Sequence, residues 1–458
     1  MSTEAGTAPA LAPPRGVRPY TIDDWRPEDP GFWENGGRRI ARRNLAFSIF
    51  SEHIGFSVWS LWSVFVLFMG PEYGFTPAQK FLLVAAPALL GSIVRLPYSF
   101  AVAIFGGRTW TIFSASLLIV PCVLAGLVLE PGVSFGTLLL VALTAGVGGG
   151  NFASSMVNIS AFYPQRLKGW ALGLNAGGGN IGVPVVQLVG LLVLATAGGS
   201  QPRLLLLIYI PLIGVAALCA ALFMNNLGEM RNDKRALRDA ARDRHTWIVS
   251  FLYIGTFGSF IGFSFAFGQV LLTQYPETFG RPIDAAYVTF LGPLIGSLIR
   301  PVGGAMADRW GGARVTFWNF IGMAGAAVLV LAASLQGSLP LFIAAFMVLF
   351  VLTGVGNGST YKMIPAIFRA KADLAVAGGA DRGAEDANAR RLSGALIGIA
   401  GAVGAFGGVL VNVAFRESFL RSGAGDAAYI GFLAFYAACV LVTWAVYLRR
   451  GPGRLAEV

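Results

Sequence analysis

Charged residues are scarce in this chain. Of its 458 residues only 12% are Asp, Glu, Lys or Arg, whereas 55% are hydrophobic. A soluble domain of ordinary composition carries about 25% charged residues. So few charges cannot cover the two or three soluble domains that a chain of this length would otherwise form. The composition therefore excludes an ordinary soluble protein.

Histidine and cysteine are scarcer still. The only His residues are His53 and His245, and the three Cys residues (Cys122, Cys219 and Cys439) lie inside apolar runs. This pattern offers neither a disulfide framework nor the paired spacing of a zinc site. We therefore expect no metal and no cofactor. The net charge of +11 does not indicate a nucleic-acid partner, because most bases fall where short cytoplasmic loops are expected.

The chain contains several long runs of uncharged, apolar residues. The run LLLLIYIPLIGVAALCAALFM at residues 204–224 exceeds the roughly 18 apolar residues that a bilayer-spanning helix needs. A spanning segment must satisfy its own backbone hydrogen bonds, which predicts helices throughout. We expect an all-α polytopic membrane protein with twelve spans, near residues 44–68, 79–105, 109–129, 134–160, 168–194, 203–226, 247–271, 284–306, 314–334, 340–367, 392–415 and 427–448.

A polar segment at 227–246, LGEMRNDKRALRDAARDRHT, separates two sets of six spans. It predicts an N-terminal bundle at 44–226 and a C-terminal bundle at 247–448, joined by a linker. Short tails at 1–43 and 449–458 complete the division. Placing the linker and both tails in the cytoplasm puts most Lys and Arg on that side, as the positive-inside rule requires. We expect a multi-pass protein of the cell membrane, functional as a monomer.

An internal repeat supports this division. Residues 91–107, GSIVRLPYSFAVAIFGG, align without a gap to residues 296–312, GSLIRPVGGAMADRWGG. A second echo relates residues 146–156 to residues 354–364. Parallel repeats of six helices are the arrangement of major facilitator transporters, whose substrate sites lie between the repeats near the middle of the membrane.

Two arginines fall inside the predicted spans, at equivalent places in the repeat. Arg95 and Arg300 carry charges that a guanidinium does not lose on burial, at a cost of at least about 2.5–3.5 kcal/mol each. Backbone carbonyls or carboxylates could satisfy them, but Glu52 is the single acid deep in any predicted span. The alternative that we favour is an anion gripped by two forked donors.

Glu52, His53 and Lys362 admit more than one interpretation. Glu52 is either a proton site or a counter-charge that helps the bundle fold. His53 is adjacent but points about 100° away on a helix, so we assign it a structural role. Lys362 near the cytoplasmic end of its span either extends to the interface or contributes to anion exit. We also expect a charge cluster of Asp308 and Arg309 in a cytoplasmic loop.

Glycine recurs every three or four residues in the fifth and eleventh spans. Such helix faces allow close packing, and they also allow helices to slide. Two Asn residues, Asn175 and Asn180, lie within the first of these runs and add donors that apolar packing does not need. The candidate gating glycines are Gly173, Gly177, Gly398, Gly401 and Gly404.

Taken together, these motifs resemble the nitrate/nitrite porters of the major facilitator superfamily (NarK-type). The resemblance covers about residues 25 to 410. It rests on WRPEDPGFW and RRNL before the first span, RLPYSF…FGGR from Arg95, GGGNFASSMVNIS in the fourth span and ALGLNAGGGNIGVPVVQ in the fifth. It continues with LYIGTFGSFIGFS, with GPLIGSLIRPVGGAMADRWGG and with the glycine run of the eleventh span.

The resemblance implies roles for the matching residues. Arg95 and Arg300 bind the anion, Tyr253 donates its hydroxyl, and Asn180 or Asn175 donates an amide. Aromatic walls that sandwich the flat anion are implied for Phe152, Phe257 and Phe56. Nitrate is planar and delocalised, so stacking faces with in-plane donors suit its chemistry.

Several alternatives remain at this point. Repulsion between two arginines in an empty cavity favours nitrate/nitrite exchange, while a proton on Glu52 would permit nitrate–proton symport. The segment SEHIGFSVWSLWS around Glu52 departs from the pattern expected of the family's exchangers. Another small planar anion, such as formate or cyanate, would also fit two arginines. A membrane enzyme lacks a catalytic constellation here, and an anion sensor lacks a soluble output domain.

Overall fold

A computed structural model describes residues 20–199, 201–228, 234–449 and 455. The outermost parts of both predicted tails and the middle of the predicted linker lie outside these residues. Among the described residues, twelve helices are long and apolar enough to cross a membrane, which confirms the predicted number of spans. They run Pro30–Phe68, Pro77–Phe105, Gly107–Val128, Phe135–Phe162, Gln165–Ala197, Arg203–Phe223, Arg244–Gln274, Pro282–Trp310, Gly312–Leu335, Leu339–Ala377, Arg382–Ser422 and Asp426–Leu448.

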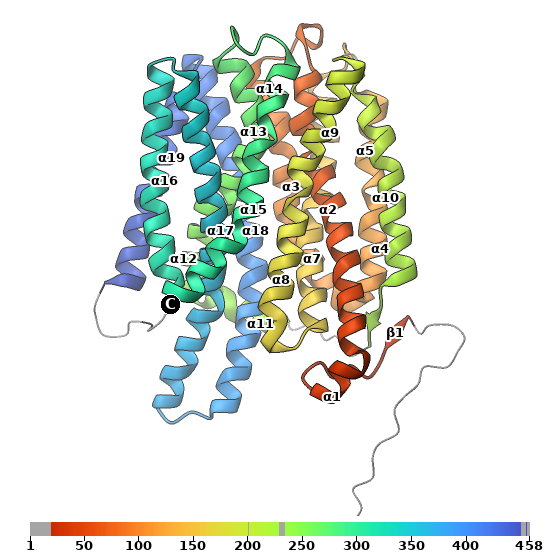
Figure 1. Ribbon diagram of the computed structural model, residues 1–458, viewed down its shortest axis with the longest axis vertical. Coiled ribbons are helices and arrows are strands. Elements are labelled where there is room, and N and C mark those ends of the chain that lie inside the picture. Colours follow the sequence, from red (N-terminus) through yellow and green to blue (C-terminus); the bar gives the residue numbers. More distant parts are fainter. Residues whose placement is uncertain (1–19, 200, 229–233, 450–454, 456–458) are drawn as a thin grey trace, which may run out of the picture.

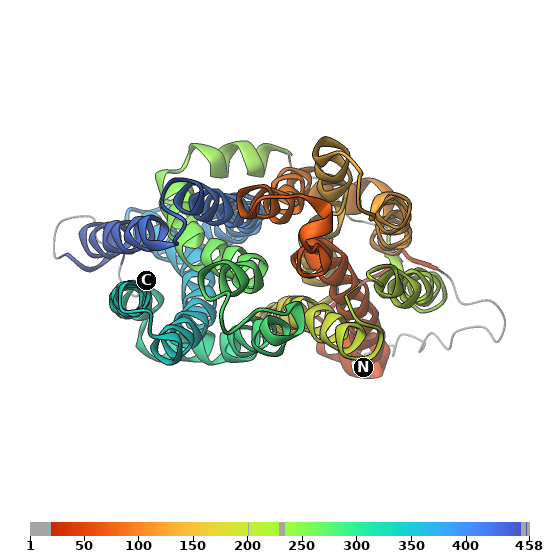
Figure 2. The same ribbon diagram turned by 90° about the horizontal axis from the view of Figure 1, so that it is seen from above.

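The spans form one helical bundle in two groups, here called the N-half and the C-half (Figures 1 and 2). The N-half comprises α1 (Pro30–Phe32), η1 (Trp33–Gly37), α2 (Arg38–Phe68), η2 (Pro71–Tyr73), α3 (Pro77–Phe105), α4 (Gly107–Leu117), α5 (Ile119–Val128), α6 (Phe135–Thr144), α7 (Val147–Phe162), α8 (Gln165–Asn180), α9 (Gly182–Ala197) and α10 (Arg203–Phe223). The C-half comprises α12 (Arg244–Tyr253), η3 (Ile254–Gly258), α13 (Ser259–Gln274), α14 (Pro282–Thr289), α15 (Leu291–Trp310), α16 (Gly312–Leu335), α17 (Leu339–Ala377), α18 (Arg382–Ser422), α19 (Asp426–Thr443) and η4 (Trp444–Leu448).

The sequence repeat has a structural counterpart. The second and eighth spans are each 29 residues long and begin at Pro77 and Pro282, so their limits are offset by the same 205 residues as the motifs. Each span ends at a glycine with positive φ, Gly106 at 85° and Gly311 at 86°. Only glycine adopts this backbone conformation without strain. The two glycines therefore turn the chain into the next span at equivalent places in the two halves.

The N-terminal segment packs across one end of the N-half, here called the base. The first helix begins at Pro30, where the Asp29 carboxylate caps the backbone N–H groups of Gly31 and Phe32. This start precedes the expected residue 44, because hydropathy detects only the membrane-crossing part of a helix. The short strands β1 (Thr21–Ile22) and β2 (Asn226–Leu227) pair in parallel at the base.

Aromatic side chains anchor this segment. The Trp25 indole donates to the Ala161 carbonyl at 3.2 Å, and Trp33 is buried in a small apolar cluster with Phe162 and Tyr163. Within the predicted N-terminal tail, the described residues from 20 onward are therefore attached to the base. The helix α11 (Lys234–Arg242) of the linker lies against α18 at the same end, where Asp239 pairs with Arg391 at 2.8 Å.

Two spans extend well beyond their predicted limits. The helix α17 continues beyond its predicted end at residue 367, and α18 begins before its predicted start at residue 392. Together they form a hairpin that projects below the base (Figure 1). Asp381 caps the start of α18 by accepting from the Ala384 amide. The hairpin is rich in charged residues. A search for apolar runs therefore does not detect this part of the two helices.

Contacts between the halves concentrate towards the end opposite the base, here called the top. The Phe81 ring of α3 stacks on Phe415 and Phe419 of α18, with ring centroids 5.8 and 5.3 Å away. The Trp59 ring of α2 meets Phe265 of α13 at 5.3 Å. The Phe81 stack lies near the start of α3 at the top, and the Trp59–Phe265 contact lies deeper in the interface, beside Arg95.

Glycine allows the closest helix contacts within the C-half. A Cβ atom on Gly358 of α17 would lie 2.4 Å from the carbonyl oxygen of Arg300 and 2.5 Å from the nitrogen of Gly304. The two helices can approach this closely only because Gly358 has no side chain. This contact also fixes the backbone that carries Arg300.

Replacing this glycine should destabilise the protein. We expect Gly358→Ala to lower the free energy of unfolding by about 1–3 kcal/mol, since α15 and α17 must separate to admit the methyl group. Gly325→Ala on α16 is the matched control, because its Cβ would meet no atom within 4 Å. Thermal unfolding of the purified protein, followed by tryptophan fluorescence, would measure both. Equal midpoints for the two variants would contradict this account of the contact.

Candidate functional site

The repeat places two arginines at one depth. Arg95 is the nineteenth residue of the second span and Arg300 is the nineteenth of the eighth. Their exposed fractions are 0% and 6%. Neither forms an ion pair within the part of the chain that the structure describes. Two permanent charges are thus buried, one from each half, without a neutralising carboxylate in contact.

Arg95 connects the two halves through its hydrogen bonds. Its Nε donates to the Gly149 carbonyl of α7 at 3.1 Å, and its Nη1 donates to the Gly401 carbonyl of α18 at 2.7 Å. Its Nη2 is buried and has no partner among the described residues. Backbone carbonyls therefore satisfy part of this guanidinium and leave one nitrogen available.

Arg300 is held more loosely. Its Nη2 donates to the Tyr253 hydroxyl at 3.3 Å, and the described residues offer its Nη1 no acceptor. The guanidinium carbon lies 5.8 Å from the centre of the Tyr361 ring. Arg300 thus also presents a free donor, from the opposite half.

Aromatic rings link the two arginines. The Arg95 guanidinium carbon lies 4.7 Å from the centre of the Phe152 ring and 5.1 Å from that of Phe257. Phe257 stacks on Tyr253 at 5.2 Å with an interplanar angle of 10°, and Tyr253 bonds Arg300. Phe152 and Phe257 face each other across the halves at 6.3 Å. In this state the two predicted walls flank the Arg95 guanidinium.

Two further rings complete this wall. Phe56 meets Phe152 edge to face at 6.2 Å. Trp59, which sequence reasoning did not select, lies 5.3 Å from the Arg95 guanidinium carbon. Its place one helical turn after Phe56 and two turns after Glu52 could have suggested this role, because residues three, four or seven apart share a helix face.

A local change of helix type positions Tyr253 and Phe257. The π-helical turn η3 begins directly after Tyr253 and includes Phe257. Such turns are frequent at functional sites. The Tyr253 ring packs onto α18 where Gly404 leaves room, since a Cβ there would lie 2.5 Å from the ring. Gly404, predicted as a gating glycine, therefore also seats a site residue.

Glu52 lies in a polar cluster beside the arginines. Its Oε2 accepts from the Ser155 hydroxyl and, at 2.6 Å, from the Asn175 amide. Its Oε1 is buried and has no described partner. Gly179 of α8 permits this arrangement, because a Cβ there would meet Oε1 at 2.2 Å. Sequence reasoning missed Ser155, whose type and spacing carry no distinguishing signal.

The two candidate Asn residues have different surroundings. The Asn175 amide nitrogen is engaged by Glu52 and by the Ser155 hydroxyl at 2.8 Å. Asn180 is buried, and neither its amide nitrogen nor its oxygen has a described partner. It directly follows Gly179, which packs against Glu52. Of the two, Asn180 is the one with a free donor.

The charge cluster expected at residues 308–309 has a different composition. Asp308 of α15 accepts from Lys362 of α17 at 2.8 Å through both oxygens, and the Arg309 guanidinium lies 5.6 Å from the Trp310 ring. The cluster therefore includes a cation from α17, Lys362, which the sequence did not indicate. The Lys362 amine is held in this exposed ion pair, and its two predicted roles, extension to the interface and anion exit, stay predictions.

The predicted gating glycines fall into two groups. A Cβ on Gly173, Gly177 or Gly398 would meet no atom within 4 Å, so these positions border open space. A Cβ on Gly401 would lie 3.6 Å from Nη1 of Arg95. The glycines near the arginines are packed, and those nearer the base are not.

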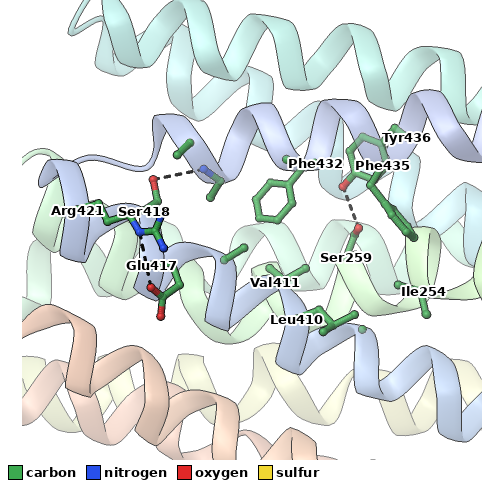
Figure 3. A pocket seen from close by; sticks show the side chains of 15 residues that line it. Ile254, Ser259, Leu410, Val411, Glu417, Ser418, Arg421, Phe432, Phe435 and Tyr436 are labelled. Atoms are coloured by element: carbon green, nitrogen blue, oxygen red, sulfur yellow. Dashed lines mark hydrogen bonds and ion pairs between the residues drawn. The ribbon is translucent and has the colours of Figure 1, made fainter.

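A groove of about 410 Å³ lies away from these residues, between α18, α19 and the start of α13. Figure 3 shows Ser259 bonded to Tyr436 near one end and Glu417 beside Arg421 near the other. Its lining includes none of the predicted site residues. The groove is therefore separate from the paired arginines.

Comparisons with known proteins agree with the geometry. A family model described as Major Facilitator Superfamily matches residues 45–412. The nitrate/nitrite transporters NarU of Salmonella typhimurium and of Escherichia coli are each 42% identical, over 94% of this chain and 97% of theirs. A probable nitrate/nitrite antiporter, NarK2 of Thermus thermophilus, is 35% identical over the same shares.

Solved structures share the fold. A bacterial homologue of the human lysosomal transporter Spinster, in an inward-facing and occupied conformation, gives a TM-score of 0.63 at 15% identity, over 89% of this chain and 98% of that one. A D-xylose–proton symporter gives 0.61 at 16% identity, over 88% and 95%. At these identities the likeness concerns the architecture alone.

Proposed function

This chain belongs to the major facilitator superfamily and, within it, to the nitrate/nitrite porters; on that premise we propose that it carries nitrate and nitrite across the cell membrane by alternating access. The anion binds between Arg95 and Arg300 at the interface of the halves. The base, with its basic loops, faces the cytoplasm. The observation that carries the proposal is the pair of unpartnered guanidinium nitrogens, Nη2 of Arg95 and Nη1 of Arg300.

The surroundings of the arginines suit a flat anion. Phe152 and Phe257 offer ring faces from opposite halves, and the guanidinium groups offer in-plane donors. Tyr253, bonded to Arg300, and Asn180, with its free amide, supply neutral donors. On entry the anion displaces the Arg95 guanidinium from its position between the Phe152 and Phe257 rings. Other planar anions such as formate and cyanate would test this fit as competitors of nitrate uptake.

Electrostatics favour exchange as the mode of transport. Two guanidinium charges about 7 Å apart at an effective dielectric of about 20 repel by roughly 2–3 kcal/mol. A bound anion removes this repulsion and lets the halves close around it. The empty site resists closure, so the carrier returns with a second anion. We therefore propose that nitrate enters as nitrite leaves.

The two ends of the interface support a rocking motion. Stacked rings close the top, including Phe81 with Phe415 and Phe419. Towards the base, Gly173, Gly177 and Gly398 are unpacked, since a Cβ on each would meet no atom within 4 Å. In the opposite state α8 and α18 move together along these small residues and close the cytoplasmic end.

Proton-coupled nitrate symport is the second candidate, and Glu52 favours it. Its carboxylate is buried with one oxygen unpartnered. In this position Glu52 can change its charge beside the two arginines. Ionised Glu52 would offset part of their repulsion in the empty carrier, and protonation on nitrate binding would keep the total charge constant. The role of a fixed counter-charge is the alternative that the following experiments separate.

The arginine fork should be essential. We expect Arg300→Lys to reduce nitrate uptake into proteoliposomes by at least about 100-fold, because a lysine provides a point charge and loses the bonds that a planar fork makes to Tyr253 and the anion together. Arg309→Lys is the matched control at the exposed end of the same helix. Wild-type affinity and rate in Arg300→Lys would refute the proposed binding mode.

Glu52→Gln separates exchange from symport. Nitrate uptake would be measured with nitrite inside or absent, and with or without an inward proton gradient. If Glu52 carries a proton, wild-type uptake responds to the gradient without internal nitrite, and Glu52→Gln loses that response while nitrite still drives uptake. His53→Gln should keep the response, since His53 faces the Gly178 carbonyl at 3.3 Å. Wild-type uptake that depends on internal nitrite alone would leave exchange as the mode and Glu52 as a counter-charge.

A further inference from the structure

Tyr361 of α17 has a buried hydroxyl with no described partner. Its ring lies 5.8 Å from the Arg300 guanidinium carbon and 6.3 Å from the Tyr253 ring. Tyr361 thus approaches Arg300 from a helix to which neither the repeat nor the resemblance assigned a binding residue.

The Tyr361 hydroxyl is unsatisfied although it lies next to a charged group. A buried hydroxyl without a hydrogen bond is unfavourable, and a phenylalanine of the same shape would avoid that penalty. The next residue, Lys362, is engaged by Asp308 on the other side, and the described protein offers the hydroxyl no acceptor. A ligand that brings an acceptor into the site would remove the penalty.

Counting donors identifies what that ligand needs. Nη2 of Arg95 and Nη1 of Arg300 can each take one oxygen of an anion. Two oxygens are all that nitrite has, whereas nitrate has a third in the same plane. The Tyr361 ring lies 5.8 Å from the Arg300 guanidinium carbon, so its hydroxyl is a further donor at this site, in addition to the Tyr253 hydroxyl and the Asn180 amide.

We propose that the Tyr361 hydroxyl donates a hydrogen bond to the third oxygen of nitrate and thereby makes the site prefer nitrate to nitrite. This inference rests on the proposed function, since it assigns a selectivity to the same site. A site that donates a hydrogen bond to one particular atom of its ligand discriminates strongly against an analogue that lacks this atom, because the donor is then left unpaired. Nitrite leaves Tyr361 as unpartnered as it is in the empty protein.

Tyr361→Phe tests the assignment. Dissociation constants for nitrate and for nitrite would be measured by calorimetry on the purified full-length protein, wild type and variant. We expect the variant to bind nitrate at least about tenfold more weakly, the loss of one hydrogen bond to a charged group. Nitrite affinity should change by less than about threefold. The ratio of the two constants does not depend on the fraction of protein that is folded.

Tyr98→Phe is the matched control. Its hydroxyl is also buried without a described partner, but its ring packs edge to face on Trp110 of α4 at 4.9 Å. The control should leave the nitrate-to-nitrite ratio at the wild-type value. An unchanged ratio in Tyr361→Phe, whether both affinities fall together or neither falls, would overturn the assignment and leave the transport proposal standing. A wild-type protein that binds neither anion would overturn both.

Discussion

A guanidinium group keeps its charge when it is buried, and most of the site follows from that constraint. Arg95 and Arg300 lie inside membrane-spanning helices, where an uncompensated charge is costly. The protein satisfies the Arg95 guanidinium with two backbone carbonyls and with the faces of aromatic rings, and leaves one nitrogen open. Arg300 has fewer compensating contacts: one hydrogen bond to the Tyr253 hydroxyl, and the Tyr361 ring at a greater distance. Under the proposed function, this incomplete compensation makes an anion a favourable third partner.

Meeting that constraint requires helices to approach closely at particular points. Gly404 seats the Tyr253 ring, Gly179 makes room for the Glu52 carboxylate, and Gly358 brings α17 against the backbone of Arg300. Each of these glycines serves a neighbour on another helix. The glycine-rich faces near the arginines therefore act as packing surfaces, whereas those nearer the base border open space. One compositional pattern thus has two physical roles, which depend on where the partner helix lies.

Glu52 modifies the same electrostatic balance from within the N-half. Ser155 and Asn175 bind one of its oxygens and connect α2, α7 and α8. The carboxylate makes no ion pair with either arginine among the described residues, yet it lies within their electrostatic range. A group in that position affects the charge of the site without occupying the place of the anion. Its protonation state is therefore the variable on which exchange and symport differ.

The amino-acid sequence by itself determined the number of spans, the six-plus-six repeat and the equivalence of Arg95 and Arg300, because these depend on hydrophobic runs and local spacing. Through the resemblance to a family it also predicted Tyr253, Phe152 and Phe257 as binding residues, and the structure places all three around the arginines. Only the tertiary structure decided that Lys362 pairs with Asp308, that Asn175 is engaged by Glu52 while Asn180 is not, and that Trp59 and Tyr361 approach the arginines. These relations join residues on different helices. The rotation and depth of each helix against its neighbours set them, and no local sequence period records those quantities.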